Sequence, residues 1–366
     1  MKVEEYFDVL REKTEKAYDL GEKAREQSKD PEQRIDIPVA EDLPEKASSL
    51  VIAAKFPELE DSGVAERIRT LEDKYGKNDE RVSFQIAREI AQGDFHEFDE
   101  IERACDAGVR VGASYMTGGI TTAPLEGIGN VKVRENDDGT QYLAMYYSGP
   151  IRSAGGTASA MSVLLADYVR IGVDLDRFKP SETVVKRYAT EVEDYYNRVT
   201  AKQYNPTREE VKKIASNVPV EVTGSPTENL DVSNYKDLDR IDTNQIRGGM
   251  CLVYLDGLPL KAPKIKKRIK KWGEDFGLEH WGWVEDYLKL QKEIHSSGED
   301  EEAGDNEGKD KYTPSDKFLG SLTAGRPIFA HPGRKGGFRL RYGHSRTNGL
   351  AAVSFHPATM EITERF

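Results

Sequence analysis

Residues 148–170, SGPIRSAGGTASAMSVLLADYVR, decide how the middle of this chain folds. The preceding residues 129–147, GNVKVRENDDGTQYLAMYY, place apolar and aromatic residues on both sides of an Asp-Gly turn, which predicts a β-hairpin. The glycines at positions 155 and 156 then precede a long apolar run, which predicts a helix. We therefore expect a strand, a Gly-rich turn and a helix in succession, an arrangement that often faces a phosphate.

The Gly-rich turn allows two interpretations. The backbone amides of Gly155, Gly156 and Thr157, with the helix dipole behind them, would bind an anion, and Arg152 would add a bidentate contact. The segment GPIRSAGGT lacks the lysine of the Walker A motif, and its glycines do not fit the dinucleotide fingerprint. The alternative is a tight strand-to-helix turn in which the two glycines permit close packing. Spacing alone leaves both interpretations open.

The composition excludes several classes of protein. The chain has 366 residues and a formal net charge of -12, which disfavours a uniformly basic nucleic-acid binder but allows local basic patches. Its two cysteines, Cys105 and Cys251, are far apart and form no CxxC pair, so the sequence predicts neither a zinc ribbon nor a disulfide framework. The N-terminal segment is charged throughout and no long apolar run occurs, so we expect an intracellular, cytoplasmic protein without a membrane partner.

The N-terminal part of the chain is predicted to be helical. Apolar residues recur at helical spacing through residues 3–27, which predicts an amphipathic helix that packs on the protein's own core or docks on another subunit. In the docking interpretation Phe7 and Leu10 are the expected anchors. A linker broken by prolines completes the first region, residues 1–50, and a second helical region covers residues 51–125.

Residues 126–294 are predicted to mix helices and strands. Ser181 has the position of a helix N-cap, and Thr207 with Glu210 predicts a capping box at the start of a short helix. The apolar segment GGMCLVYLDGLPLKA, residues 248–262, is predicted to form a buried strand and a turn.

Two basic segments stand out against the acidic average. The first, KAPKIKKRIKKW at residues 261–272, predicts a helix with Pro263 in its first turn, and because its cations spread around the helix a solvated face is the alternative to a binding surface. The second, HPGRKGGFRLRYGHSR, predicts a strand with Arg339 and Arg341 on one face and apolar side chains on the other. Between the two segments, residues 295–316 form an acidic linker that is predicted to be disordered.

The sequence predicts no catalytic constellation. None of its six histidines has metal-ligand spacing with another, neither GxSxG nor HExxH occurs, and no compact acidic cluster for Mg²⁺ lies in a segment predicted to be structured. We therefore expect the chain to bind a partner and to perform no chemistry alone.

Five blocks of the sequence resemble the large subunit of archaeal DNA polymerase D, also called DNA polymerase II. They are, in order, TAPLEGIGNVKVREN, YYSGPIRSAGGTASAMSVLLADYVR, IRGGMCLVYLDGLPLKAPKI, AGRPIFAHPGRKGGFRLRYGHSRTNG and HPATME. The family's large subunit is much longer, so we expect a fragment, a truncated form or the first product of a split gene. The resemblance implies an α+β fold: a helical N-terminal region, then a mixed KH-like α/β region, ending at the start of a double-psi β-barrel in residues 317–366.

The resemblance also implies partners and a cofactor. The family's large subunit performs templated DNA synthesis in replication, together with a small subunit that carries 3′–5′ exonuclease activity. The implied partners are therefore a DNA primer–template, the small exonuclease subunit and the remainder of the large subunit. Mg²⁺ is implied in the complete enzyme, held by aspartates of a later segment that is not in this chain. The implied DNA-contacting residues are Arg152, Lys264, Lys267, Lys271, Arg334, Lys335, Arg339, Arg341 and Arg346.

Two other classes of function remain open from the sequence. One is a stand-alone nucleic-acid-binding or assembly module without polymerase activity. The other is a metabolic enzyme that binds a phosphorylated small molecule at the Gly-rich turn.

Overall fold

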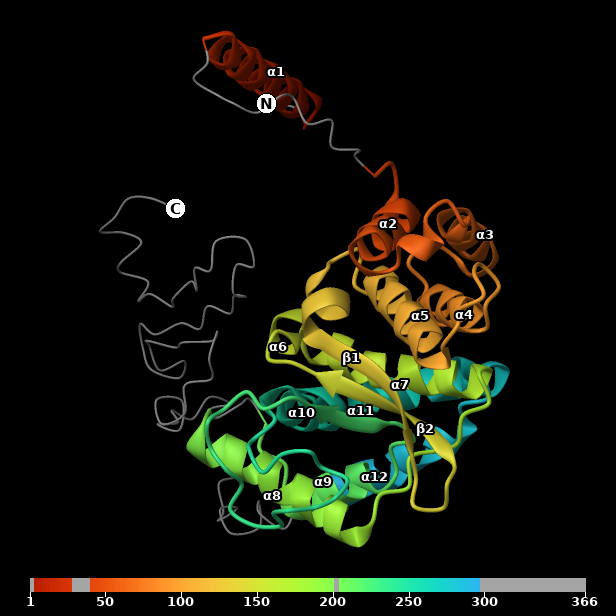
Figure 1. Ribbon diagram of the computed structural model, residues 1–366, viewed down its shortest axis with the longest axis vertical. Helices are drawn as coiled ribbons and strands as arrows, with labels where there is room; N and C mark the ends of the chain where they lie inside the picture. Colours follow the sequence, from red (N-terminus) through yellow and green to blue (C-terminus); the bar gives the residue numbers. More distant parts are fainter. Residues whose placement is uncertain (1–2, 28–39, 201–203, 297–366) are drawn as a thin grey trace, which may run out of the picture. The chain divides into compact units, whose positions relative to one another are not determined.

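The computed structural model describes residues 3–27, 40–200 and 204–296. This part of the chain is α+β, as predicted, with many helices around a small sheet (Figure 1). It divides into two units, Met1–Glu41 and Asp42–Phe366. The predicted arginine strand lies outside the described residues, and with it the candidate site residues Arg334, Lys335, Arg339, Arg341 and Arg346.

The first unit contains α1 (Val3–Glu26), the helix predicted from the apolar spacing. Lys16 and Glu12 lie one turn apart on its exposed surface and form an ion pair of 2.6 Å. Phe7 and Leu10 belong to α1, but their side chains fall outside the described part of the structure. Their docking role therefore stays a prediction.

The second unit begins with a group of helices that share an apolar core of their own. These are α2 (Leu43–Lys55), α3 (Val64–Tyr75), α4 (Glu80–Ala91) and α5 (Ile101–Met116). Asp42 caps α2 by accepting a hydrogen bond from the amide of Glu45, and Asp79 caps α4 by accepting one from the amide of Arg81. Gly76 ends α3 with φ of 101°, a conformation that favours glycine, so the chain can turn back into α4.

The predicted hairpin supplies two strands of a three-stranded sheet of order β1-β2-β3, in which β2 is central. Strand β1 (Ile128–Glu135) runs antiparallel to β2 (Gln141–Tyr147), and β3 (Glu221–Gly224) runs parallel to β2. Gly139 occupies the turn with φ of 82°, which confirms the Asp-Gly turn expected from the sequence.

Helix α7 (Gly156–Gly172) follows the sheet and runs through the core of the second unit (Figure 1). The chain leaves β2, makes one short helix, α6 (Ile151–Ala154), and turns at Gly155 into α7. Nearly every side chain in the middle of α7 is buried, because α4, α5, α11 and β2 all pack against it. The predicted order of strand, Gly-rich turn and helix is confirmed.

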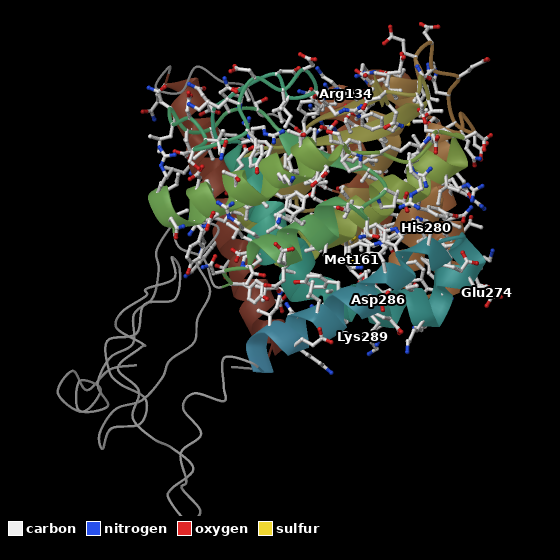
Figure 2. The ribbon with its side chains drawn as sticks, turned by 90° about the horizontal axis from the view of Figure 1, so that it is seen from below. Arg134, Met161, Glu274, His280, Asp286 and Lys289 are labelled. Atoms are coloured by element: carbon white, nitrogen blue, oxygen red, sulfur yellow. The ribbon has the colours of Figure 1, made fainter. Side chains whose placement is uncertain are left out.

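The remaining helices cover the other side of the sheet and of α7. They are α8 (Glu182–Arg198), α9 (Arg208–Ala215), α10 (Gly248–Leu252), α11 (Leu258–Arg268) and α12 (Trp283–Ser296). The N-cap at Ser181 and the capping box of Thr207 and Glu210 are present as predicted. Asp286 and Lys289 lie on the exposed face of α12 (Figure 2). No helix in the described ranges is both long enough and apolar enough to cross a membrane.

The prediction for residues 248–262 was wrong. This segment forms α10, a π-helical turn at Val253–Gly257 and the first part of α11, not a strand and a turn. Its apolar run is buried on all sides, and a short continuous apolar run fits a buried helix as well as a buried strand. The helix therefore starts earlier than expected: Pro259 lies in its first turn, and Pro263 lies inside it.

Candidate nucleic-acid interface

The Gly-rich turn is shaped by two different requirements at adjacent glycines. Gly155 has φ of 85°, a backbone conformation that residues with a Cβ rarely adopt. Gly156 has an ordinary φ, but a Cβ there would lie 2.1 Å from the carbonyl oxygen of Asp256. The close packing expected of a tight turn is therefore present, and it brings the start of α7 directly against the segment that leads into α11.

Two lysines of α11 reach the N-terminus of α7. The Nζ of Lys264 donates to the Thr157 Oγ1 over 3.1 Å. The Cε of Lys261 lies 3.2 Å from the position of a Cβ on Gly156. The two motifs singled out in the sequence, the Gly-rich turn and the lysine-rich helix, thus meet at one place. We call this group, Gly156, Thr157, Lys261 and Lys264, the lysine–turn cluster.

Lys261 was not among the candidate site residues, although it lies in the basic segment. Its position three residues before Lys264 places both lysines on the same side of a helix, and this spacing was a signal available in the sequence. The ammonium group of Lys264 lies beside the N-terminus of α7 and places a positive charge there in an acidic protein. The arrangement suits an anion such as a phosphate.

The other cations of the basic segment are divided between ion pairs and solvent. Lys266 and Lys270 contact Glu285 of α12 at 3.2 and 3.1 Å, and Arg268 pairs with Glu80 of α4. These contacts tie α11 and the π-helical turn that follows it, Ile269–Gly273, to α12 and α4. The candidates Lys267 and Lys271 are exposed, as expected for a solvated face or for a binding surface.

Arg152 lies on α6, before the Gly-rich turn, and its side chain is exposed. Burial raises the pKa of Tyr195 to about 12, and the guanidinium of Arg152 is near enough to oppose that rise. The contact of Arg152 with a phosphate remains a prediction.

A cavity of about 210 Å³ opens beside the first turn of α7. Its apolar lining includes Met116, Ile120, Ala154, Ala158 and Met161. Its polar lining consists of Glu80, Thr117 and Thr157. Met161 is labelled in Figure 2, on the helix that forms one wall. Thr157 belongs both to this cavity and to the lysine–turn cluster, so the two features are continuous.

The buried carboxylates of the described residues serve the fold. Asp167 accepts hydrogen bonds from His280 at 2.6 Å and Trp281 at 2.7 Å, and forms an ion pair with Arg170 at 2.8 Å. Glu221 accepts from the hydroxyls of Tyr142 and Tyr188.

Glu191 is a further buried carboxylate, on α8. Its carboxylate forms ion pairs with Arg247 at 2.8 Å and with Arg187 at 3.1 Å, and all three side chains are almost completely buried. Burial by itself raises the pKa of this carboxyl, but the two guanidinium groups hold it below its ordinary value.

These carboxylates do not fit Mg²⁺. Each already accepts hydrogen bonds from cationic or hydroxyl groups, which leaves little room for a hydrated ion that prefers free carboxylate oxygens. Among the described residues, no group of three or more histidine, cysteine or acidic side chains lies together as metal ligands would.

Two family models match successive segments of the chain. A family model described as "DNA polymerase II large subunit DP2, N-terminal" matches residues 5–290. A second, described as "DNA polymerase II large subunit DP2, central domain", matches residues 304–366. The first match covers the helices, the sheet and the lysine–turn cluster described above.

Individual relatives agree with the family models. A protein named DNA polymerase II large subunit from Nanoarchaeum equitans is 43% identical over 381 residues, which cover 99% of this chain and 31% of the relative. A protein of the same name from Methanococcoides burtonii is 43% identical over 362 residues, which cover 99% of this chain and 30% of the relative. Another, from Methanothermobacter thermautotrophicus, is 44% identical over 362 residues, which cover 98% of this chain and 31% of the relative. The chain therefore spans less than a third of the length of these relatives.

Proposed function

The chain belongs to the DNA polymerase II large subunit family, and we propose that it is the N-terminal part of the polymerising subunit of a replicative archaeal DNA polymerase. The observation that carries this proposal is the match to the family's N-terminal and central models over almost the whole chain. The resemblance drawn from the five sequence blocks is thereby confirmed.

The proposed role of this part is to scaffold the polymerase and to contact DNA. The lysine–turn cluster supports it, because the Lys264 ammonium group and the amides at the start of α7 suit a backbone phosphate. Phosphate contacts hold the protein on DNA without sequence preference, as a replicative enzyme requires. We also propose that residues 126–294 are KH-like and that residues 317–366 begin a double-psi β-barrel.

The proposed partners are a DNA primer–template, a small subunit with 3′–5′ exonuclease activity and the remainder of the large subunit. Polymerisation requires Mg²⁺ ligands that the described residues do not supply. As the family resemblance implies, we place those ligands in the remainder of the large subunit, and we assign no step of the reaction to the described residues.

The test is reconstitution. The chain is co-expressed with a candidate small subunit and with the remaining large-subunit chain, and the purified assembly is assayed for primer extension with Mg²⁺ and nucleotides. Extension by the assembly, with none by the chain alone, is the expected result. Failure to co-purify, combined with DNA binding by the chain alone, would instead favour a stand-alone nucleic-acid-binding or assembly module.

A second assay addresses binding of a small phosphorylated metabolite at the Gly-rich turn. A tight ligand raises the apparent thermal stability of a protein by mass action. We expect a panel of phosphorylated metabolites to leave the melting temperature of the chain unchanged. A saturable rise with one of them would support the metabolic-enzyme alternative.

A further inference from the structure

The cavity beside α7 has two chemically different parts that share one residue. Most of its lining residues are apolar, Met116 and Met161 among them. Its edge is cationic, because Thr157 lines the cavity and also accepts the hydrogen bond from Lys264. A ligand that fills the cavity and carries a negative charge at this edge would satisfy both parts.

The size of the cavity restricts the ligand. A volume of about 210 Å³ is below the roughly 300 Å³ at which sites for whole drug-sized ligands begin. The cavity therefore suits one flat ring system rather than a complete nucleotide cofactor. Methionine suits such a ring, because its flexible, polarisable thioether makes favourable contacts with aromatic groups.

The polar side chains of the cavity offer hydrogen-bonding groups of both kinds. Thr157 Oγ1 accepts from Lys264, so its own proton is free to point elsewhere. Thr117 Oγ1 donates to the carbonyl of Ala113 over 2.8 Å, so its lone pairs can still accept. The carboxylate of Glu80 is neutralised by Arg268 and therefore does not leave an isolated negative charge in the cavity. A ring with hydrogen-bond donors and acceptors on its edge could therefore bond to these side chains in more than one arrangement of donors and acceptors.

From this combination we propose that the cavity takes a single unstacked base of single-stranded DNA, while the adjoining phosphate lies at Lys264 and the start of α7. The inference rests on the proposed DNA contact and deepens it, because it assigns a binding mode to one nucleotide. A base and its phosphate are neighbours on a strand, as the cavity and the lysines are neighbours here. Insertion of a base also differs from the double-strand backbone contact that the lysine–turn cluster alone would make.

An apolar side chain of a protein partner is the competing occupant. The apolar lining and the exposed Ile120 would accept one. Charge complementarity favours DNA, because the Lys264 ammonium group and the positive end of the α7 dipole both lie at Thr157, which lines the cavity. A neutral apolar anchor would use none of these groups.

The first experiment needs no variant. The 366-residue chain is titrated with a fluorescent oligothymidylate and with an oligonucleotide of the same length and charge in which the bases are replaced by abasic sites. We expect the oligothymidylate to bind at least about fivefold more tightly, the size of effect that contact with a single base gives. Equal affinities would overturn the proposal, because phosphate contacts alone would then explain the binding.

The second experiment fills the cavity. Ala154→Leu and Ala158→Leu each add a side chain to its lining, and Ser153→Leu is the matched control on the exposed surface of α6. Thermal melting first establishes that each variant is folded. Filling the cavity should lower the affinity for oligothymidylate towards that for the abasic strand and leave the abasic affinity unchanged, whereas the control should change neither.

The remaining outcomes separate this inference from the proposed function. Loss of small-subunit co-purification in the cavity variants, with unchanged DNA affinity, would assign the cavity to a protein anchor and overturn the proposal. If neither oligonucleotide binds to the chain or to the assembled polymerase, the DNA contact itself fails. Tight binding of both oligonucleotides with equal affinity would support the proposed DNA contact and overturn only the base site.

Discussion

The ammonium group of Lys264 lies 3.1 Å from the hydroxyl of Thr157, across 107 residues of sequence. This contact joins the basic helix to the turn that opens α7. It brings the two motifs singled out in the sequence together at the start of α7.

The lysine–turn cluster should contribute to the salt dependence of DNA binding. Replacing Lys261 and Lys264 together by Gln removes two cations from one place, so we expect weaker binding of DNA of any sequence. The slope of log affinity against log salt should fall by roughly one unit for each phosphate that the protein no longer neutralises. The measurement is a binding titration of the assembled polymerase across a salt series.

A control from the same helical segment is available for this prediction. Lys266 and Lys270 pair with Glu285, so their replacement by Gln removes the same charge away from the cluster. We expect that double variant to retain most of the salt slope. Equal losses of slope in the two double variants would show that only total charge matters.

We predict that substitution of Gly156 impairs folding more directly than it impairs DNA binding. A Cβ at this position would lie 2.1 Å from the carbonyl oxygen of Asp256, a clash that neither backbone can relieve without moving. We expect Gly156→Ala to lower the free energy of unfolding by about 1–3 kcal/mol, as overpacking typically does, and Gly156→Val to be worse. Urea denaturation followed by circular dichroism measures this.

Gly149 provides the control, because a Cβ there would meet no atom within 4 Å. Gly149→Ala should therefore leave stability nearly unchanged. A Gly156 variant of normal stability that has lost only its DNA affinity would show that the turn is chiefly a phosphate site.

Much of this region could be predicted from local sequence. The Asp-Gly turn, the paired glycines and the caps at Ser181 and Thr207 are local signals, because each depends on residues within one turn of chain. Residues 248–262 could not be assigned in this way, since a buried apolar run carries no periodicity that separates a strand from a helix. The approach of Lys261 to Gly156 could not be predicted either, because it depends on how α11 crosses α7.

The stability of the fold should decrease in acid partly through Glu191. Its folded-state pKa is lowered, so the unfolded chain binds protons more readily near the ordinary glutamate pKa of about 4.3. The stabilisation is therefore present above that pH and is lost as the pH falls through the folded-state pKa. Unfolding measured between neutral and acidic pH should show this fall in the wild-type chain.

Glu191→Gln tests the role of this carboxylate. It leaves Arg187 and Arg247 buried without their anion, so we expect a loss of roughly 3–5 kcal/mol at neutral pH and a shallower fall in acid. Glu182→Gln on the same helix removes an exposed partner of Lys186 and should change little. An unaltered acid profile in Glu191→Gln would assign the acid sensitivity to other carboxylates.

Helix α1 should hold a partner of the polymerase. Replacing Phe7 and Leu10 by Asp places two charges among the apolar positions of this amphipathic helix, so we expect loss of co-purification with the small subunit or with the rest of the large subunit. The exposed Asp8 and Glu12 serve as controls, because their replacement by Lys changes charge without touching those positions. Complex formation by the Phe7 and Leu10 variant would favour the alternative that α1 packs within its own chain.

The last prediction concerns Arg339 and Arg341, which lie outside the described residues and are argued from the sequence alone. In GFRLRY the two arginines alternate with Phe338, Leu340 and Tyr342, so a strand would direct the arginines to one side and the apolar side chains to the other. A slip of one residue would bury two guanidinium groups without partners, which opposes any other register. We therefore predict that the arginines face DNA, because the planar guanidinium can bind a phosphate with two hydrogen bonds.

Replacing both arginines by Gln should weaken DNA binding about equally for unrelated sequences and lower the salt slope by roughly one unit for each phosphate released. The assembled polymerase is titrated with DNA across a salt series, with Lys309→Gln and Lys311→Gln in the acidic linker as a control that removes equal charge from a segment expected to stay away from DNA. An unchanged slope in the folded arginine variant would mean that this strand does not touch the backbone, because neutralising fewer phosphates necessarily changes the number of ions released on binding.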